Sequence, residues 1–323
     1  MITVRNLTKD YGVHRAIEDL NFTAEKGEVL GFLGPNGAGK TTTMRILTGF
    51  MPPTSGTATI DGFDVVDDSL KVRQHVGYLP ETVPLYEDMR VYDYLKFMGN
   101  LHKIDGIDGR VEDVLEKVGM VDRSQSLIKN LSKGMRQRIG LGQALLHQPD
   151  VLILDEPTIG LDPKQIKEVR NLIKSIGKEK TVMLSTHILS EAQQICDRVI
   201  IINKGRIVAE DAPQNLQTRL SSVRTVYVRV RESAEKAASL IREIPGIVAV
   251  KISDEGQIQF ENVLDQDARP LVAKILVNGG FDLLELAPEA INLEEIFLKL
   301  TRESGETGAQ DTPPEEEQKG SEA

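Results

Sequence analysis

The sequence predicts an α/β domain followed by a smaller α+β domain, and three observations lead to this expectation. Residues 1–215 alternate strand-like and helix-like patterns, which is typical of parallel strands joined by helices. The richest apolar runs, at 151–154 and 199–202, have the length of buried parallel strands. After Pro213 a polar stretch ends this pattern and a new series of elements begins. We therefore expect a first domain at 1–215 and a second at 220–300.

The first domain contains a region without strands. Before it, a buried strand at 28–33 leads into a Gly-rich turn and a helix at 40–47. Between about 85 and 148 helical patterns dominate, including a helix at 136–146. Another strand follows at 181–185. We expect the region 85–148 to be a helical insertion in the α/β domain.

The second domain has the element order βαββαβ, which is that of a ferredoxin-like unit. The expected strands lie at 225–230, 247–253, 257–261 and 282–287, and the expected helices at 234–244 and 267–277. A last helix is expected at 293–300. The Glu, Gly, Pro and Ser content of residues 301–323 predicts a disordered acidic tail.

Composition excludes several classes of protein. The net charge is −10, and the last 23 residues hold seven acids against two bases, so the rest of the chain is mildly acidic. Such a surface argues against nucleic acid as a partner. No apolar stretch approaches the ~18 to 20 residues of a membrane-spanning helix. Cys196 is the only cysteine, which rules out an internal disulfide and favours a small buried core residue.

A phosphate-binding loop is the strongest functional motif. Residues 34–41 read GPNGAGKT and match G-x-x-x-x-G-K-[ST]. Glycines let the backbone wrap phosphates while amide groups and a helix N-terminus face the negative charge. Lys40 would reach the β- and γ-phosphates, and the Thr41 hydroxyl would ligate Mg²⁺. The loop residues expected to bind nucleotide are Gly34, Asn36, Gly37, Ala38, Gly39, Lys40 and Thr41.

Two acids follow the apolar strand at 151–154. Asp155 falls at the carboxyl edge of the expected sheet, where ligands of α/β proteins bind. Asp155 can hold Mg²⁺, which leaves Glu156 to polarise an attacking water. A strand that ends in acids only for solubility is the alternative, and the phosphate loop makes it the weaker one.

Five segments together resemble the ATPase domains of ABC transporters, in the order found in that family. They are 34–42, 131–135 (LSKGM), 154–158 (LDEPT), 160–162 (GLD) and 185–187 (STH). The resemblance covers residues 1 to about 215, extends the phosphate loop to Thr42 and implies the ABC-type ATPase fold. The chain looks closest to ATP-binding subunits of exporters of the gliding-motility and antibiotic-resistance kind.

The resemblance also implies roles for residues outside the phosphate loop. Tyr11 would stack on adenine, although a strand-end aromatic without a ligand is the alternative. Ser132 and Gly134 would contact the γ-phosphate of ATP held by a second copy, and Asp162 would shape the dimer contact. His187 would hold the γ-phosphate and the attacking water in line. The other histidines match no site and are expected to be structural or on the surface: His14, His75, His102 and His147.

Three positions depart from the family pattern. Lys133 replaces a glycine and Met135 a glutamine in the signature segment 131–135, and Met135 lacks the polar contacts of glutamine. Glu81 stands where most members have a glutamine, and a carboxylate can ligate Mg²⁺ at least as well as an amide. Our hypothesis is that Glu81 senses Mg-ATP and relays its presence to the helical insertion.

The resemblance implies an ATPase that converts ATP and water to ADP and phosphate, with ATP and Mg²⁺ bound. Two copies would face head to tail as a homodimer on ATP binding and would power integral membrane subunits on separate chains. The place implied is cytoplasmic, peripheral at the inner face of the cell membrane, and export is favoured over import. A regulatory or non-transport ATPase of the same fold with little turnover stays open as the alternative.

Overall fold

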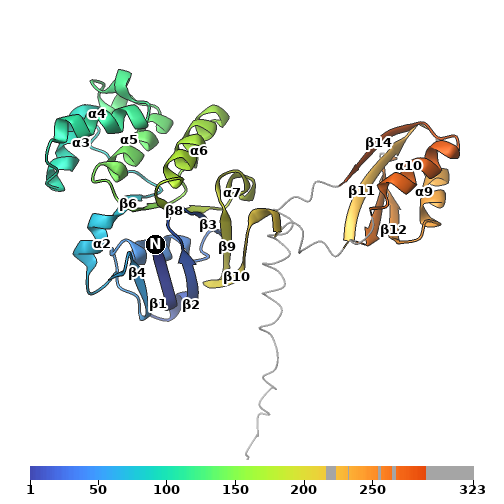
Figure 1. Ribbon diagram of the computed structural model, residues 1–323, viewed down its shortest axis with the longest axis horizontal. Coiled ribbons are helices and arrows are strands. Elements are labelled where there is room, and N and C mark those ends of the chain that lie inside the picture. The colour runs from blue at the N-terminus through green and yellow to red at the C-terminus, as the bar shows by residue number, and fades with distance from the viewer. Residues whose placement is uncertain (216–222, 232, 254–255, 264–266, 289–323) are drawn as a thin grey trace, which may run out of the picture. The chain divides into compact units, whose positions relative to one another are not determined.

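The computed structural model of the protein describes residues 1–215, 223–231, 233–253, 256–263 and 267–288 (Figure 1). The chain divides into two compact units between Pro213 and Gln214. The expected last helix at 293–300 and the expected acidic tail at 301–323 lie outside the described residues. None of the described helices has the length and apolar character needed to cross a membrane.

A six-stranded sheet forms the centre of the first unit, in the order β10-β9-β3-β8-β7-β6. The neighbours from β9 to β6 pair in parallel, and β10 pairs antiparallel with β9 at the edge. Strands β3, β7 and β8 are buried along their whole length, as their apolar runs predicted. The strands are β3 (Val29–Leu33), β6 (Val76–Leu79), β7 (Val151–Leu154), β8 (Thr181–Thr186), β9 (Arg198–Asn203) and β10 (Arg206–Asp211).

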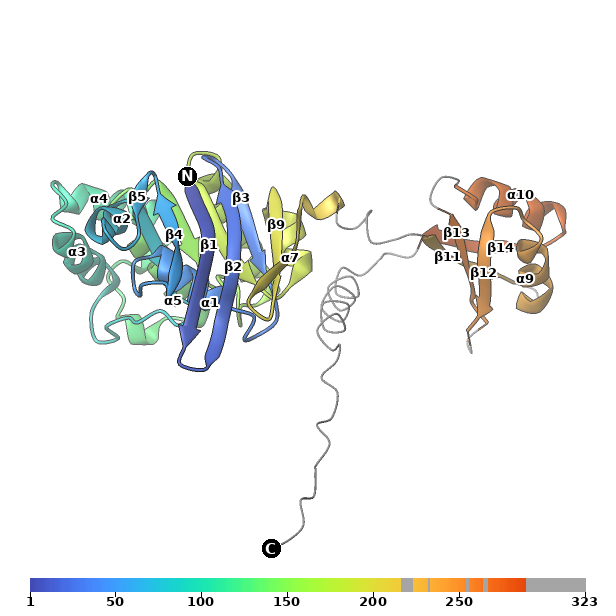
Figure 2. The same cartoon turned by 90° about the horizontal axis from the view of Figure 1, so that it is seen from below.

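A second, antiparallel sheet was not foreseen, because residues 1–215 were expected to form parallel strands joined by helices. Its order is β2-β1-β4-β5, and its first three strands lie side by side in Figure 2. The strands are β1 (Ile2–Tyr11), β2 (His14–Ala24), β4 (Ser55–Ile60) and β5 (Phe63–Asp64). Its buried side chains pack with those of the central sheet in one hydrophobic cluster, where the Phe22 and Phe32 rings lie 5.5 Å apart. One face of the antiparallel sheet is therefore covered, which explains its alternating burial.

The helices of the first unit include the predicted insertion. They are α1 (Lys40–Leu47), α2 (Ser69–His75), α3 (Val91–Leu101), α4 (Ile107–Lys117), α5 (Lys133–Leu145), α6 (Pro163–Gly177) and α7 (Leu189–Ile195), with 3-10 turns at Val121–Arg123 and Ile128–Asn130. The insertion comprises α3, α4 and α5, which gather together in Figure 1.

Helix α5 lies directly against β6. A Cβ atom on Gly77 would fall 2.2 Å from the Ala144 carbonyl oxygen, so only glycine permits this approach. The helix begins three residues earlier than expected because the Ser132 hydroxyl accepts a hydrogen bond from the Met135 amide at 3.3 Å and caps the first turn. Cys196 is buried, as predicted, and burial raises the pKa of its thiol.

The second unit has the predicted order βαββαβ. Its elements are β11 (Val223–Val230), α9 (Ala234–Arg242), β12 (Ile247–Ile252), β13 (Ile258–Val263), α10 (Arg269–Asn278) and β14 (Leu283–Pro288). The four strands pair antiparallel in the order β12-β13-β11-β14, which is the ferredoxin-like arrangement. The helices cover one face of this sheet, where Phe260 and Ile241 are fully buried.

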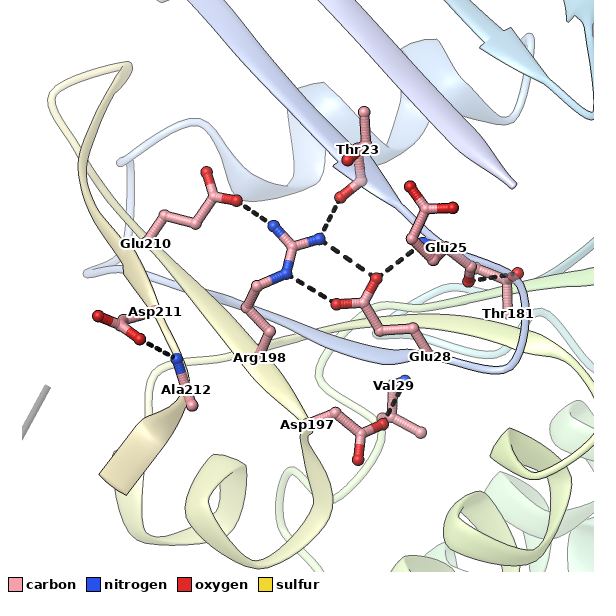
Figure 3. A network of polar contacts seen from close by, with 10 residues as sticks. All are labelled: Thr23, Glu25, Glu28, Val29, Thr181, Asp197, Arg198, Glu210, Asp211 and Ala212. Atoms are coloured by element: carbon pink, nitrogen blue, oxygen red, sulfur yellow. Dashed lines mark hydrogen bonds and ion pairs between the residues drawn. The ribbon is translucent and has the colours of Figure 1, made fainter. Parts of the chain in front are cut away.

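Arg198 ties several elements of the first unit together (Figure 3). Its guanidinium donates to Glu28 Oε1 at 2.8 Å and to the Thr23 carbonyl oxygen at 2.5 Å, and it forms an ion pair with Glu210. Hydrogen bonding to Glu28 raises the pKa of Arg198. The network joins β9 to β10, to the end of β2 and to the turn before β3, at the amino end of the central sheet.

We expect Arg198→Met to lower the free energy of unfolding by about 2 kcal/mol, because it leaves the half-buried Glu28 carboxylate without its cation. Arg206→Met is the matched control, since Arg206 is exposed and its ion pair with Glu18 lies in water. Urea unfolding of the full chain, followed by circular dichroism, measures both. Equal losses in the two variants would contradict the role given to the Arg198 network.

Candidate functional site

The phosphate loop joins the end of β3 to the start of α1. Two of its glycines have left-handed backbone angles, with φ of 80° at Gly37 and 108° at Gly39. A Cβ atom on Gly39 would fall 2.6 Å from Ile17 Cγ2 and 2.7 Å from the Ala16 carbonyl oxygen. Glycine is therefore required here both by backbone angle and by space. The loop turns sharply enough to present the first amide groups of α1 to an anion.

Lys40 is a buried cation with oxygen partners on three sides. Its side chain is 6% exposed. The ammonium donates to the carbonyl oxygens of Gly34 at 2.7 Å and Pro35 at 3.2 Å, and it lies 3.6 Å from Glu156 Oε1. A buried charge is tolerated only with such partners. Phosphate oxygens could replace these partners without leaving the cation unpaired.

The hydroxyl of Ser185 holds the two acids that follow β7. It donates to Asp155 Oδ1 at 2.6 Å and accepts from the Glu156 amide at 2.9 Å. Asp155 is 1% exposed and Glu156 is 6% exposed, so both need such partners. Strands β7 and β8 are parallel neighbours, with Leu154 opposite Leu184, and this pairing brings Ser185 beside the acids.

Glu156 stands between two basic groups in a strained conformation. Its Oε2 lies 3.0 Å from His187 Nδ1, and its Oε1 faces Lys40. The backbone φ of Glu156 is 48°, in the left-handed region that residues other than glycine rarely adopt. Strain of this kind persists only where the surroundings enforce it, and it is common at functional sites.

These groups border one cavity of about 530 Å³, the nucleotide cavity. The expected site residues that line it are Tyr11, Asn36, Gly37, Gly39, Lys40, Thr41, Thr42, Glu81, Glu156 and His187. The other expected residues of the loop and strand end, Gly34, Ala38 and Asp155, do not line this cavity. Gly34 packs against Ile202, and the side chains of Ala38 and Asp155 are buried.

The rim of the nucleotide cavity is formed by β1 and β2. Tyr11 and His14 are paired across these strands, and both line the cavity. The Tyr11 hydroxyl donates to Met51 Sδ at 3.0 Å, and the ring stays partly exposed. His14 matched no site in the sequence and was expected to be structural or on the surface; it is exposed, and it also borders this cavity. Its hairpin register with Tyr11 is the feature that places it there.

The other unassigned histidines lie away from this cavity. His75 Nδ1 is 3.0 Å from Asp150 Oδ2, and the rings of His102 and His147 stack at 4.4 Å. Burial lowers the pKa of His147 to about 4, so its ring is neutral near pH 7.

Three expected nucleotide contacts lie in a different place on the same chain. Ser132, Gly134 and Asp162 line a separate cavity of about 430 Å³, the signature cavity. The Asp162 side chain accepts from the Gln165 amide at 2.9 Å and caps α6. A Cβ atom on Gly134 would fall 2.4 Å from Gln165 Oε1, so α6 packs closely on the start of α5.

Two supporting residues had no role in the motif analysis. Ser185 bridges the acids as described, and the Thr158 hydroxyl donates to Glu191 Oε2 at 2.5 Å, with both side chains buried. The second bond anchors the segment after Glu156 to α7. Both residues fall within the matched segments 154–158 and 185–187, but their partners lie on neighbouring strands or helices, and the sequence does not show which residues those are.

The donor set suits a nucleoside triphosphate with a divalent cation. The nucleotide cavity combines an ammonium group, the N-terminus of α1 and the Thr41 hydroxyl. The Glu81 carboxylate lines the nucleotide cavity, and the buried Asp155 carboxylate lies at the end of β7 next to Glu156. Carboxylate oxygens are ligands that Mg²⁺ prefers.

Comparison with known proteins agrees with this chemistry. Residues 17–159 match the family described as ABC transporter. The bacitracin transport ATP-binding protein BcrA of Bacillus licheniformis is 37% identical over 307 residues, covering 93% of this chain and 97% of that protein. The daunorubicin resistance ATP-binding protein DrrA3 of Streptomyces coeruleorubidus is 33% identical, covering 93% and 95%.

Solved structures show the same fold. An ATP-binding subunit of an ABC transporter superposes with a TM-score of 0.62 at 30% identity, covering 68% of this chain and 92% of that one. A dimeric ATP-binding cassette in a post-hydrolysis state with ADP and phosphate superposes with a TM-score of 0.61 at 25% identity, covering 66% and 99%. With a relative similar over nearly its whole length and a matching cavity, this chain belongs to the ATP-binding subunits of ABC transporters, which hydrolyse ATP to drive transport.

Proposed function

We propose that this chain hydrolyses ATP as one of two copies that face head to tail. The separation of the two cavities carries this proposal. Lys40 and Glu156 line the nucleotide cavity, whereas Ser132 and Gly134 line the signature cavity elsewhere on the chain. A two-fold pairing would place the signature cavity of each copy over the nucleotide of the other. The dimeric relative with bound ADP and phosphate supports this arrangement.

Binding would rest on the phosphate loop and the two carboxylates near it. Lys40 would exchange its carbonyl partners for the β- and γ-phosphates, and the α1 amides would donate to phosphate oxygens. Thr41, Asp155 and Glu81 would hold Mg²⁺. The bound ion would neutralise phosphate charge. Tyr11 on the rim would stack on adenine, beside His14.

Glu156 would act as the general base. It would accept a proton from the water that attacks the γ-phosphate, while His187, at 3.0 Å from its carboxylate, would hold water and phosphate in line. Ser185 fixes the backbone of Glu156, so the carboxylate is positioned before substrate arrives. Lys40 and the loop amides would stabilise the charge that develops on the phosphate.

ATP hydrolysis would drive conformational change in integral membrane subunits on separate chains, at the cytoplasmic face of the membrane. Relatives named for bacitracin transport, daunorubicin resistance and Nod factor export support export as the direction of transport.

We expect a stoichiometric polytopic membrane protein to accompany the chain when it is purified from gently solubilised membranes with Mg-ATP. Recovery of the chain alone in several detergents would favour a non-transport ATPase.

Mixing two inactive variants tests the head-to-tail arrangement. Glu156→Gln should bind ATP but lose about 10²-fold or more of hydrolysis. Ser132→Arg should block the signature cavity. A mixed dimer would have both defects in one site and none in the other, so random pairing should restore about a quarter of wild-type turnover. Steady-state phosphate release measures this, with Glu179→Gln, an exposed acid on the surface, as the neutral control. Mixtures as inactive as each variant alone would refute the arrangement.

Ser185→Ala tests the support of the two acids. Loss of the hydroxyl leaves the Asp155 carboxylate and the Glu156 amide short of a partner, so about ten- to a hundredfold more Mg²⁺ should be needed for half-maximal hydrolysis. Ser175→Ala is the control, because that hydroxyl is exposed on α6. Magnesium titration of the ATPase rate gives the result, and an unchanged requirement in Ser185→Ala would remove this residue from the site.

A further inference from the structure

The amino end of the central sheet carries polar side chains that belong to neither the nucleotide cavity nor the signature cavity. Strands β6 and β7 are parallel neighbours that start together, with Val76 opposite Val151. The residues directly before these two positions are His75, which ends α2, and Asp150. The strand register therefore places an imidazole beside a carboxylate, whereas the nucleotide cavity lies at the carboxyl ends of the strands.

The antiparallel sheet supplies a second carboxylate at the same place. Asp61 follows Ile60, the last residue of β4, in the turn that leads to β5. The ring of Phe63 in β5 lies 5.2 Å from the ring of His75, so this turn packs on the end of α2. Three separate segments of the chain thus bring together two carboxylates and one imidazole.

The three side chains converge on one point. His75 Nδ1 lies 3.0 Å from Asp150 Oδ2 and 3.9 Å from Asp61 Oδ2. One ligand atom from each residue lies within 4.8 Å of those of the other two. In a tetrahedral site with bonds of about 2.0 to 2.1 Å, as in zinc proteins, neighbouring ligand atoms are about 3.3 Å apart. Small rotations of the two aspartates would therefore bring all three atoms to bonding distance of one ion.

Neither carboxylate forms an ion pair with a lysine or arginine within the described residues. Lys180 feels the charge of Asp150 but donates its hydrogen bond to the Pro149 carbonyl oxygen. Asp61 Oδ1 accepts from the Met1 amino group at 2.5 Å, which leaves Oδ2, the oxygen that faces His75, available to a cation. Two carboxylates share a single imidazole here, and such a group attracts a positive ion.

We propose that Asp61, His75 and Asp150 bind a divalent transition-metal ion, for which Zn²⁺ is the natural probe. The ion would replace the proton shared between His75 Nδ1 and Asp150 Oδ2, and water would complete its coordination. An imidazole nitrogen suits Zn²⁺ and its neighbours among the transition metals, whereas Mg²⁺ takes oxygen ligands. The site therefore differs in metal preference from the carboxylates of the nucleotide cavity.

A bound ion would join the two sheets of the first unit. It would tie the turn after β4, in the antiparallel sheet, to the end of α2 and to the start of β7 in the central sheet. A ligand that binds only the folded chain stabilises it. The effect of the ion is therefore on the stability of the fold, and it requires neither ATP nor a second copy of the chain.

Titration of the full chain with Zn²⁺ tests the site, in the presence of a competing zinc-binding dye. The titration is made without nucleotide and in excess Mg²⁺, which occupies sites built from oxygen alone. His75→Ala and Asp150→Asn should each weaken Zn²⁺ binding by about tenfold or more. Asp150 is exposed, so its substitution should not prevent folding.

Two other histidines provide matched controls. His102 is exposed and pairs with no carboxylate among the described residues, and His187 lies beside Glu156 in the nucleotide cavity. His102→Ala and His187→Ala should bind Zn²⁺ as the wild type does. Binding that survives both His75→Ala and Asp150→Asn, or that is lost in a control variant instead, would place the metal elsewhere and overturn the inference.

Urea unfolding gives a second readout that separates a metal site from a simple ion-pair network. Zn²⁺ should raise the urea midpoint of the wild-type chain above its value in EDTA, and it should leave the midpoint of His75→Ala unchanged. If the three side chains serve only to pair with one another, His75→Ala lowers the midpoint equally with and without Zn²⁺, and the inference is wrong.

Discussion

The adjacency of β3, β8 and β7 in one parallel sheet is the constraint on which the site depends. Parallel strands open their carboxyl ends at a single edge, and each of these three continues into a functional segment there. The phosphate loop follows β3, His187 follows β8, and the two acids follow β7. Any change of strand order would separate Lys40 from Glu156. The chemistry therefore follows from the sheet pairing as much as from the motifs themselves.

Concentrating charge at this edge has a cost in stability. Lys40, Asp155 and Glu156 are all more than nine-tenths buried, and such groups destabilise a fold unless they satisfy one another. They do so through the Ser185 hydroxyl, the loop carbonyl groups and the contact between Lys40 and Glu156. The left-handed backbone of Glu156 adds strain. The apolar cluster between the two sheets must offset these terms, and the outcome is a site whose groups are in place before a substrate binds.

Local patterns predicted the elements whose signals lie within the element itself. The helix at 40–47 was placed correctly because a glycine turn and a lysine mark its start, and the order of the second unit was readable from alternating patterns. The antiparallel sheet of the first unit was missed because β1 pairs with β4, far along the chain. For the same reason the bridging role of Ser185 and the place of His14 beside the cavity were not foreseen: each depends on a neighbour on another strand, and the pairing of those strands was not read from the sequence.

The start of α5 carries the signature cavity together with the start of α6. Ser132 and Gly134 of the one and Asp162 and Gln165 of the other line this cavity. An ion pair between Arg138 and Glu168 joins α5 to α6, whose N-terminus Asp162 caps. The close approach of Gly134 to Gln165 and this ion pair hold the starts of the two helices together. The surface that this chain would offer to the nucleotide of a second copy is thus built from the joined starts of α5 and α6, apart from the chain's own nucleotide cavity.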